Sequence, residues 1–173
     1  MKSSTGQETL RVFRNGKYDE HGRLTSYEEL NGEKDGPSSY RRWSGGDYNA
    51  KNELLSYHED VTDARGLVTG RDWKAEGYEK GRVTGTRETT TDDQGRKTTK
   101  HWVGVYDEGG RLKGYSEEGV DALGNGTLKS EEEMRYDELG RLVGYKGATR
   151  DAFGRTVNTT WRAEDLTGKT ELW

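Results

Sequence analysis

The chain has 173 residues and a formal net charge of −4, and it contains no cysteine and no apolar run long enough to span a bilayer. Apolar residues make up only 28% of the chain and charged residues 35%, with the two signs interleaved. This composition excludes a disulfide scaffold and a thiolate metal site, and it lacks the basic face that nucleic acid requires. We therefore expect no nucleic-acid partner and no membrane insertion.

One short motif recurs along the chain. Tyr-Asp-Glu-x-Gly-Arg-Leu occurs at Tyr18–Leu24, Tyr106–Leu112 and Tyr136–Leu142, and looser copies lie at Tyr48–Leu54 and Tyr78–Val83. Successive copies are 30, 30, 28 and 30 residues apart, a period typical of repeat proteins. We expect residues 1–173 to form a single array with partial repeats at both ends. Its full repeats cover residues 14–43, 44–73, 74–102, 103–134 and 135–161.

A second turn signal lies halfway between the copies. It has the form Asp-x-x-Gly and occurs at Asp63–Gly66, Asp92–Gly95, Asp121–Gly124, Asp151–Gly154 and Asp165–Gly168. An aspartate that opens a type I turn accepts hydrogen bonds from the turn's amides, and the glycine takes the positive φ that follows. In the motif copy Tyr48–Leu54, Asn52 replaces the turn glycine and tolerates the same conformation. The glycines that we assign to structural turns are Gly22, Gly66, Gly95, Gly110, Gly124, Gly140 and Gly154.

The segments between the turns have the composition of β-strands. They are rich in Thr, Tyr, Val and Trp, and none shows a helical apolar stripe. With a turn about every 15 residues, the sequence predicts an all-β protein, an elongated and twisted antiparallel meander of about 11 to 12 strands. Spiralling of the sheet is compatible with this prediction.

Aromatic residues hold fixed places relative to the turns. One set lies seven residues after a turn glycine: Phe13, Trp43, Trp73, Trp102 and Trp161, with Met134 near that place in the remaining copy. A second set lies five residues after the other turn: Tyr27, Tyr57, Tyr115 and Tyr145, with Thr86 as the exception. Strict alternation places both sets on the opposite face from the Tyr–Leu pairs of the motif, unless bulges switch them.

Small residues four positions after the motif's turn favour packing of these rings. They are Ser26, Ser56, Gly85, Gly114 and Gly144, and we expect them to leave room for a ring from the adjacent strand. The alternative is that Trp43, Trp73, Trp102 and Trp161 are exposed and form a flat platform for sugar rings.

No constellation of catalytic residues is evident. His21, His58 and His101 occupy different repeat positions without metal-ligand spacing, and we expect each to be solvated or in a cross-strand contact. The turn aspartates match no calcium motif. We therefore expect no enzyme activity, no metal and no cofactor.

The motif Tyr-Asp-x-x-Gly-Arg-Leu resembles the YD repeat of the Rhs family, which is found in bacterial surface and toxin proteins and in teneurins. The resemblance covers five short windows, about a fifth of the chain. It implies β-hairpin repeats and an extracellular or cell-surface location as part of a larger protein. The family's shell and toxic cargo are not implied, because no core-terminating motif or cargo domain follows the repeats.

Three functions are compatible with these features. The first is a non-enzymatic structural module, such as a stalk, spacer or fibre segment of a large bacterial surface or secreted protein. The second is a glycan- or surface-binding adhesin repeat with carbohydrate as its partner. The third is a shell-wall fragment of an Rhs-type toxin-delivery protein. Further expected partners are neighbouring repeats of the same chain and other copies that associate through sheet edges.

Overall fold

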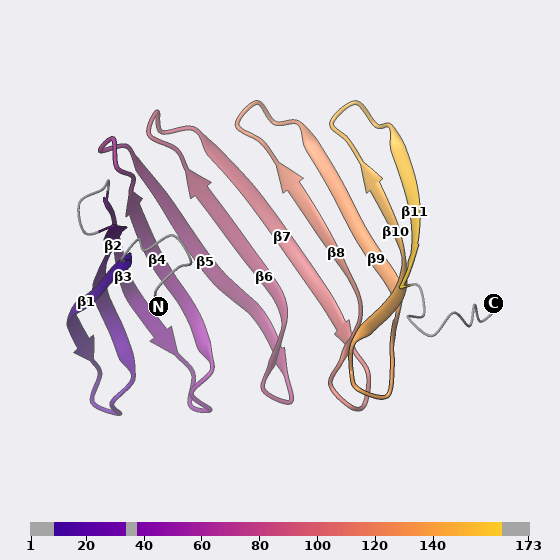
Figure 1. Ribbon diagram of the computed structural model, residues 1–173, viewed down its shortest axis with the longest axis horizontal. Coiled ribbons are helices and arrows are strands. Elements are labelled where there is room, and N and C mark those ends of the chain that lie inside the picture. Colours follow the sequence, from indigo (N-terminus) through magenta and orange to yellow (C-terminus); the bar gives the residue numbers. More distant parts are fainter. Residues whose placement is uncertain (1–8, 34–37, 164–173) are drawn as a thin grey trace. The chain divides into compact units, whose positions relative to one another are not determined.

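The computed structural model describes residues 9–33 and 38–163, and it confirms the predicted all-β class. Within these residues eleven antiparallel strands follow one another in chain order as a meander of hairpins, and no helix is present (Figure 1). The strands are β1 (Thr9–Tyr18), β2 (Leu24–Glu33), β3 (Ser38–Tyr48), β4 (Leu54–Thr62), β5 (Val68–Glu79), β6 (Arg82–Thr91), β7 (Lys97–Tyr106), β8 (Leu112–Val120), β9 (Gly126–Tyr136), β10 (Leu142–Arg150) and β11 (Thr156–Arg162). Elongation and spiralling of the array stay predictions.

The described residues include no helix that is long and apolar enough to cross a membrane.

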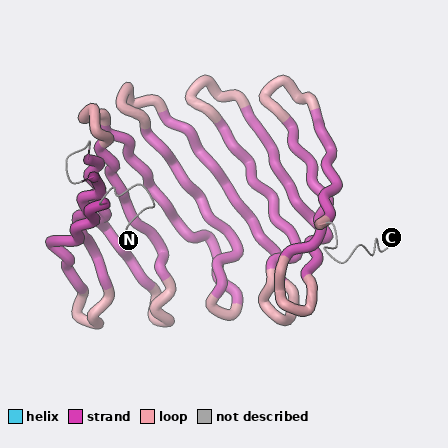
Figure 2. The backbone as a smooth tube through the Cα atoms, in the orientation of Figure 1, coloured by secondary structure: helices cyan, strands magenta, loops and turns pink. Residues whose placement is uncertain are grey.

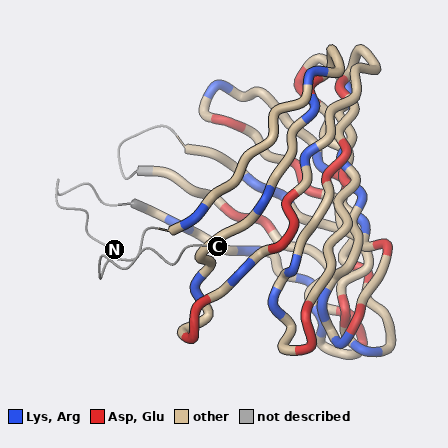
Figure 3. Tube along the Cα trace, turned by 90° about the vertical axis from the view of Figure 1, so that its right-hand side faces the viewer, with Lys and Arg blue, Asp and Glu red and all other residues tan. Residues whose placement is uncertain are grey.

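The chain divides into two compact units, Met1–Thr99 and Lys100–Trp173. In the first unit, each strand from β1 to β6 pairs with the next one along the chain. In the second unit, β8 to β11 pair in the same consecutive manner. Short loops join the strands of each unit (Figure 2), and basic and acidic residues are interspersed along the strands and turns of both (Figure 3).

All described turns but one follow one pattern, and the exception is the two-residue turn between β5 and β6. In the first turn, Gly22 N–H donates to the Asp19 carbonyl at 3.0 Å, and Asp19 N–H donates to the Arg23 carbonyl at 2.9 Å. This is a type I turn followed by a left-handed bulge residue. All seven glycines that the sequence assigns to turns have φ between 76° and 85°. Asn52 takes the same place with φ 62°. The predicted turn at residues 165–168 lies outside the described residues.

A bulge near the first turn brings two aromatic residues to the same face of the sheet. In the first hairpin the register shifts between Arg14 and Lys17 on β1, and it shifts again beside Tyr18. A Cβ built on Gly16 would lie 3.3 Å from the Phe13 ring and 3.6 Å from the Tyr18 ring, so both rings are on the same side. Strict alternation placed them on opposite faces, and the bulge is the reason that they are not.

Glycines under the rings lie elsewhere than the sequence suggested. The Trp43 ring covers Gly46, where an added Cβ would be only 2.3 Å from the ring, and the Trp102 ring covers Gly104 at 2.2 Å. At Gly114 the nearest atom is instead the Glu131 carbonyl oxygen of the adjacent strand, at 2.7 Å. The proposed role of Gly114 in accommodating a ring was therefore wrong, because backbone rather than a ring occupies that space.

Candidate functional site

Five aromatic rings lie in a row across the first unit, with three of the four neighbouring pairs stacked and Trp43–Tyr57 tilted by 36°. The row runs through Phe13, Tyr27, Trp43, Tyr57 and Trp73, with successive ring centroids 4.9, 5.6, 5.6 and 5.3 Å apart. Each ring comes from a different strand, β1 to β5, because the register places Tyr27 opposite Trp43 and Tyr57 opposite Trp73. Trp43, at the centre, is 8% exposed. The row stops at β6, which carries Thr86 in the tyrosine position.

The second unit contains two separate ring pairs. Trp102 stacks on Tyr115 with centroids 6.3 Å apart, and Tyr145 stacks on Trp161 at 5.6 Å. Strand β9 lies between them and places Glu131 opposite Tyr115. The residue in the ring position of this copy is thus Glu131, whereas the sequence pointed to Met134. Lys129 fills the gap: its ammonium group lies 5.4 Å from the Tyr115 ring centroid and 3.0 Å from the Glu131 carboxylate.

A line of opposite charges runs beside the row. A basic residue lies two positions before the rings of Phe13, Trp43, Trp73 and Trp102. On the neighbouring strand a glutamate lies two positions after Tyr27, Tyr57, Thr86 and Tyr115. Side-chain alternation puts them on the same face as the rings. The ion pairs of the line in the first unit are Arg11–Glu29 at 2.5 Å, Arg41–Glu59 at 3.5 Å and Arg71–Glu88 at 2.7 Å. The second unit has an equivalent pair, Lys100–Glu117 at 3.7 Å.

Glu29 is the most deeply buried member of this line, at 3% exposure. It accepts hydrogen bonds from Asn31 Nδ2 at 2.5 Å and from Arg11 Nε at 2.9 Å. The Asn31 amide and the Arg11 guanidinium lower the pKa of Glu29 below its ordinary value, so the carboxylate stays charged at neutral pH. Both carboxylate oxygens of Glu29 accept hydrogen bonds from within the sheet, so this buried side chain serves as a packing element.

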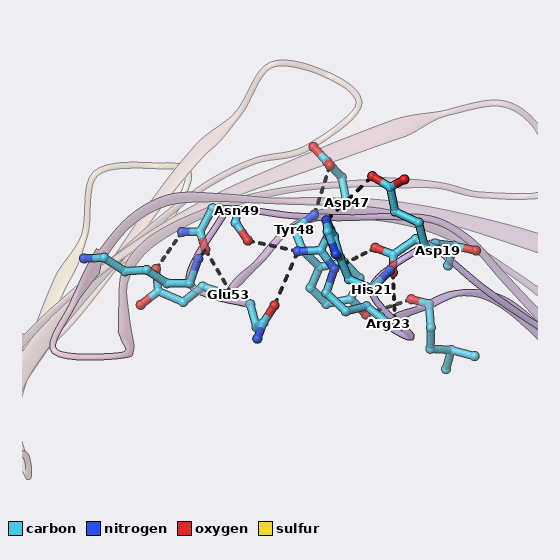
Figure 4. A network of polar contacts seen from close by, with 12 residues as sticks. Asp19, His21, Arg23, Asp47, Tyr48, Asn49 and Glu53 are labelled. Atoms are coloured by element: carbon cyan, nitrogen blue, oxygen red, sulfur yellow. Dashed lines mark hydrogen bonds and ion pairs between the residues drawn. The ribbon is translucent and has the colours of Figure 1, made fainter.

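The repeated motif builds a polar network at its turn, and Figure 4 shows this network around the first two copies. Asp19 Oδ1 accepts from the backbone N–H of His21 at 2.8 Å and of Arg23 at 2.9 Å, and Asp19 Oδ2 accepts from Arg23 Nε at 2.6 Å. These bonds, led by the Arg23 backbone amide, lower the pKa of Asp19. The carboxylates of these turns are therefore engaged by their own turn, which accounts for the aspartate at this position.

Within each unit the same network joins neighbouring copies of the motif. The Tyr48 hydroxyl donates to the Leu24 carbonyl at 2.8 Å, and the Arg23 guanidinium lies 5.2 Å from the Tyr48 ring centroid. In the second unit Tyr136 donates to the Leu112 carbonyl at 2.8 Å, and Arg111 lies over the Tyr136 ring. Tyr78 likewise donates to the Leu54 carbonyl. Burial raises the pKa of these tyrosines, which remain hydroxyl donors at neutral pH.

The second copy keeps this hydrogen-bond pattern with altered chemistry. Asn49 replaces the aspartate and Glu53 the arginine, and Asn49 Nδ2 donates to the Glu53 carboxylate at 2.6 Å. Asn49 Oδ1 still accepts from the backbone of Lys51 and Glu53. Glu53 cannot form a cation–π contact, and its charge adds to burial in raising the pKa of Tyr78.

His58 is in a cross-strand cluster on the other face. Its Nδ1 lies 2.7 Å from Asp72 Oδ1 and its Nε2 3.0 Å from Asp60 Oδ1, while Arg42 Nη2 lies 2.9 Å from Asp60 Oδ2. Hydrogen bonding to Asp72 is the first cause that raises the pKa of His58, and Asp60 adds to it, while burial opposes both. Residues 9–33 and 38–163 contain no group of three or more side chains arranged to hold a metal ion.

The four tryptophans that could form a glycan platform are thus not a set of parallel exposed plates. Trp43 lies between Tyr27 and Tyr57, and Trp73 and Trp102 each stack on one tyrosine. Trp161 is the most accessible of the four, at 37% exposure. The row occupies ring faces that a sugar would need, so its main chemical capacity is cohesion between strands.

Sequence reasoning did not find the line of ion pairs or the tyrosine hydroxyl bonds. A signal for the ion pairs was present, because a base two residues before the ring recurs at Arg11, Arg41, Arg71 and Lys100. The hydroxyl bond joins residues 24 apart in the chain and has no local sequence mark.

In comparisons with known proteins, no family model matches this chain and no curated protein sequence matches it.

Proposed function

We propose that this chain is a non-enzymatic structural module, a stalk, spacer or fibre segment of a larger surface or secreted protein. The observation that carries the proposal is the link between successive motif copies. A tyrosine hydroxyl bonds the carbonyl 24 residues earlier at Tyr48, Tyr78 and Tyr136. A bond of this kind between neighbouring copies within a unit lets an array extend by adding copies, as solenoids do.

The packing supports the same function. Rings and ion pairs of the first unit bind strand to strand along one direction, while the described side chains include only two buried apolar residues, Trp43 and Ala75. Cohesion of this kind depends on nearest neighbours and does not require a closed core. The resemblance of the motif to the YD repeat favours an extracellular or cell-surface location.

The repeat-number experiment tests this proposal. A variant with a second copy of residues 44–73 inserted after Trp73 would extend the meander by two strands. We expect its free energy of unfolding in urea to rise and its maximum dimension in solution scattering to grow by about 10 Å, two strand spacings. An unfolded variant, or one that folds without growing, would contradict the proposal.

A glycan-binding adhesin repeat is the second candidate, and one observation favours it. Phe13 and Trp161 are 51% and 37% exposed, and each stacks on one ring only. A panel of oligosaccharides titrated against tryptophan emission tests this function. A saturable shift that Trp161→Ala abolishes would replace the structural proposal with the adhesin, and an unchanged spectrum throughout the panel would reject the adhesin.

A further inference from the structure

The two outer strands differ in the chemistry of their open edges. Strand β1 carries Arg11, Arg14 and Lys17, and it is interrupted by a bulge in which Asn15 has φ 55°. Charges and bulges on an edge strand are the usual protection against pairing with another chain. This edge is therefore blocked.

Strand β11 has none of these protections along most of its length. Residues Thr156–Trp161 include no charge, glycine or proline, and every residue of the strand is exposed. It pairs with β10 at seven consecutive positions without a register shift. Within the part of the chain that the structure describes, β10 is its only strand neighbour. A straight, exposed, uncharged edge of β-branched residues is a template for strand addition.

Two hydrogen bonds show which backbone groups of β11 point away from β10. Asp151 N–H donates to the Arg155 carbonyl, and Ala163 N–H donates to the Val143 carbonyl. Odd-numbered residues of β11 thus direct their N–H and C=O groups toward β10. Because these directions alternate along an antiparallel strand, Asn158 and Thr160 direct theirs to the open side.

We infer that β11 is an interaction edge that pairs antiparallel with β11 of a second copy of this chain. A two-fold axis at Asn158 lets the outward amides and carbonyls of both copies bond reciprocally. In that register Trp161 stands opposite Arg155 of the second copy, a pairing suited to a cation–π contact, and Val157 stands opposite Thr159. Because β1 is blocked, the pairing closes at a dimer and does not continue into a filament.

Sedimentation velocity of the full chain at increasing concentration tests this inference. We expect a reversible monomer–dimer equilibrium. Asn158→Pro removes an outward donor while leaving the bonds to β10, so it should give a monomer, whereas Asn158→Ala keeps the amide and should still dimerise. Circular dichroism checks that both variants keep the β-sheet.

A second variant keeps the inference falsifiable if the proline variant does not fold. Asn158→Lys places two like charges beside the axis, and it should give a monomer at low salt and a dimer at high salt. A wild-type chain that stays monomeric at every concentration would overturn the inference. Species that grow beyond the dimer would overturn it too, as would equal loss of dimer in the alanine and proline variants. The test is independent of the repeat-number experiment, since insertion at Trp73 leaves β11 unchanged.

Discussion

In the first unit five rings follow one another without a break from Phe13 to Trp73, whereas in the second unit the rings form two separate pairs around β9. The strand geometry is similar in both units, since each uses consecutive antiparallel hairpins and the same bulged Asp-x-x-Gly turn recurs in both. What differs is one side chain per strand. A sheet with few buried apolar residues therefore depends on which residue occupies the ring position, because little other burial compensates for a change there.

The central ring of the continuous row should show the largest effect. Trp43→Ala removes a buried ring with two neighbouring rings, and we expect it to lower the free energy of unfolding by about 3 kcal/mol. Trp161→Ala, at the end of a two-ring pair, should cost roughly 1 kcal/mol. Urea denaturation followed by circular dichroism measures both. Equal costs at the two positions would show that continuity of the row does not matter.

The glycine under the central ring offers the next largest effect. In Gly46→Ala the new Cβ would lie 2.3 Å from the Trp43 ring and 2.8 Å from the Leu24 carbonyl oxygen, which accepts the Tyr48 hydroxyl. We expect a loss of about 2 kcal/mol, since neither the ring nor the backbone has room to move.

Gly70→Ala on β5 is the matched control for this change. Its nearest neighbour is an Asp60 carboxylate oxygen at 3.5 Å, an ordinary contact, and the variant should keep the wild-type stability or exceed it slightly. Similar losses of stability in both variants would mean that these glycines matter for the strand backbone and not for the space that they leave for a ring.

Introducing a ring at the ring position of β9 should change the stability by less than the two losses above. Glu131→Trp alone lacks the glycine that lies three residues after Phe13 and Trp43, because Met134 occupies that place in β9. In a double-mutant cycle we expect Glu131→Trp and Met134→Gly to couple favourably by about 1 kcal/mol, as a ring stacked on Tyr115 would. Zero coupling would show that the glycine is not what admits the ring.

Sequence spacing predicted the fold well because turns carry strong local signals. Asp-x-x-Gly and the positive φ at Asn52 depend on four or five adjacent residues, so the strand count and order followed directly. It was harder to predict which face of the sheet each aromatic side chain occupies. Phe13 and Tyr18 are five apart, and only a bulge that the spacing cannot locate returns them to one side.

The sequence predicted which aromatic residues recur but not whether their rings are exposed or packed. The periodic tryptophans were identified as either a platform or a packed row, and composition alone could not decide between the two. The decision depends on ring-to-ring distances set by cross-strand register, which brings Tyr27 opposite Trp43. The sequence pointed to Met134 and not to Glu131 as the residue in the ring position of β9, because the extra residue Gly126 obscures the spacing in this copy.

The smallest expected effect is a pH dependence confined to the first unit. Asp72 and Asp60 raise the pKa of His58 above its ordinary value, with Arg42 bound to Asp60 on the far side. A group with a raised folded-state pKa contributes its stability fully below its unfolded pKa of about 6.5, and the contribution disappears as the pH rises through the folded value. The free energy of unfolding should therefore fall as the pH rises above about 6.5.

The size of this fall is limited by solvent, because the His58 side chain is partly exposed and its ion pairs are screened. We expect less than about 1 kcal/mol. Carboxylates titrate below this pH window, so they do not obscure the measurement. His58→Gln should remove the slope while keeping a side chain that can donate to Asp72. A slope that persists in this variant would assign the pH dependence to another group and leave the His58 cluster a neutral cross-strand contact.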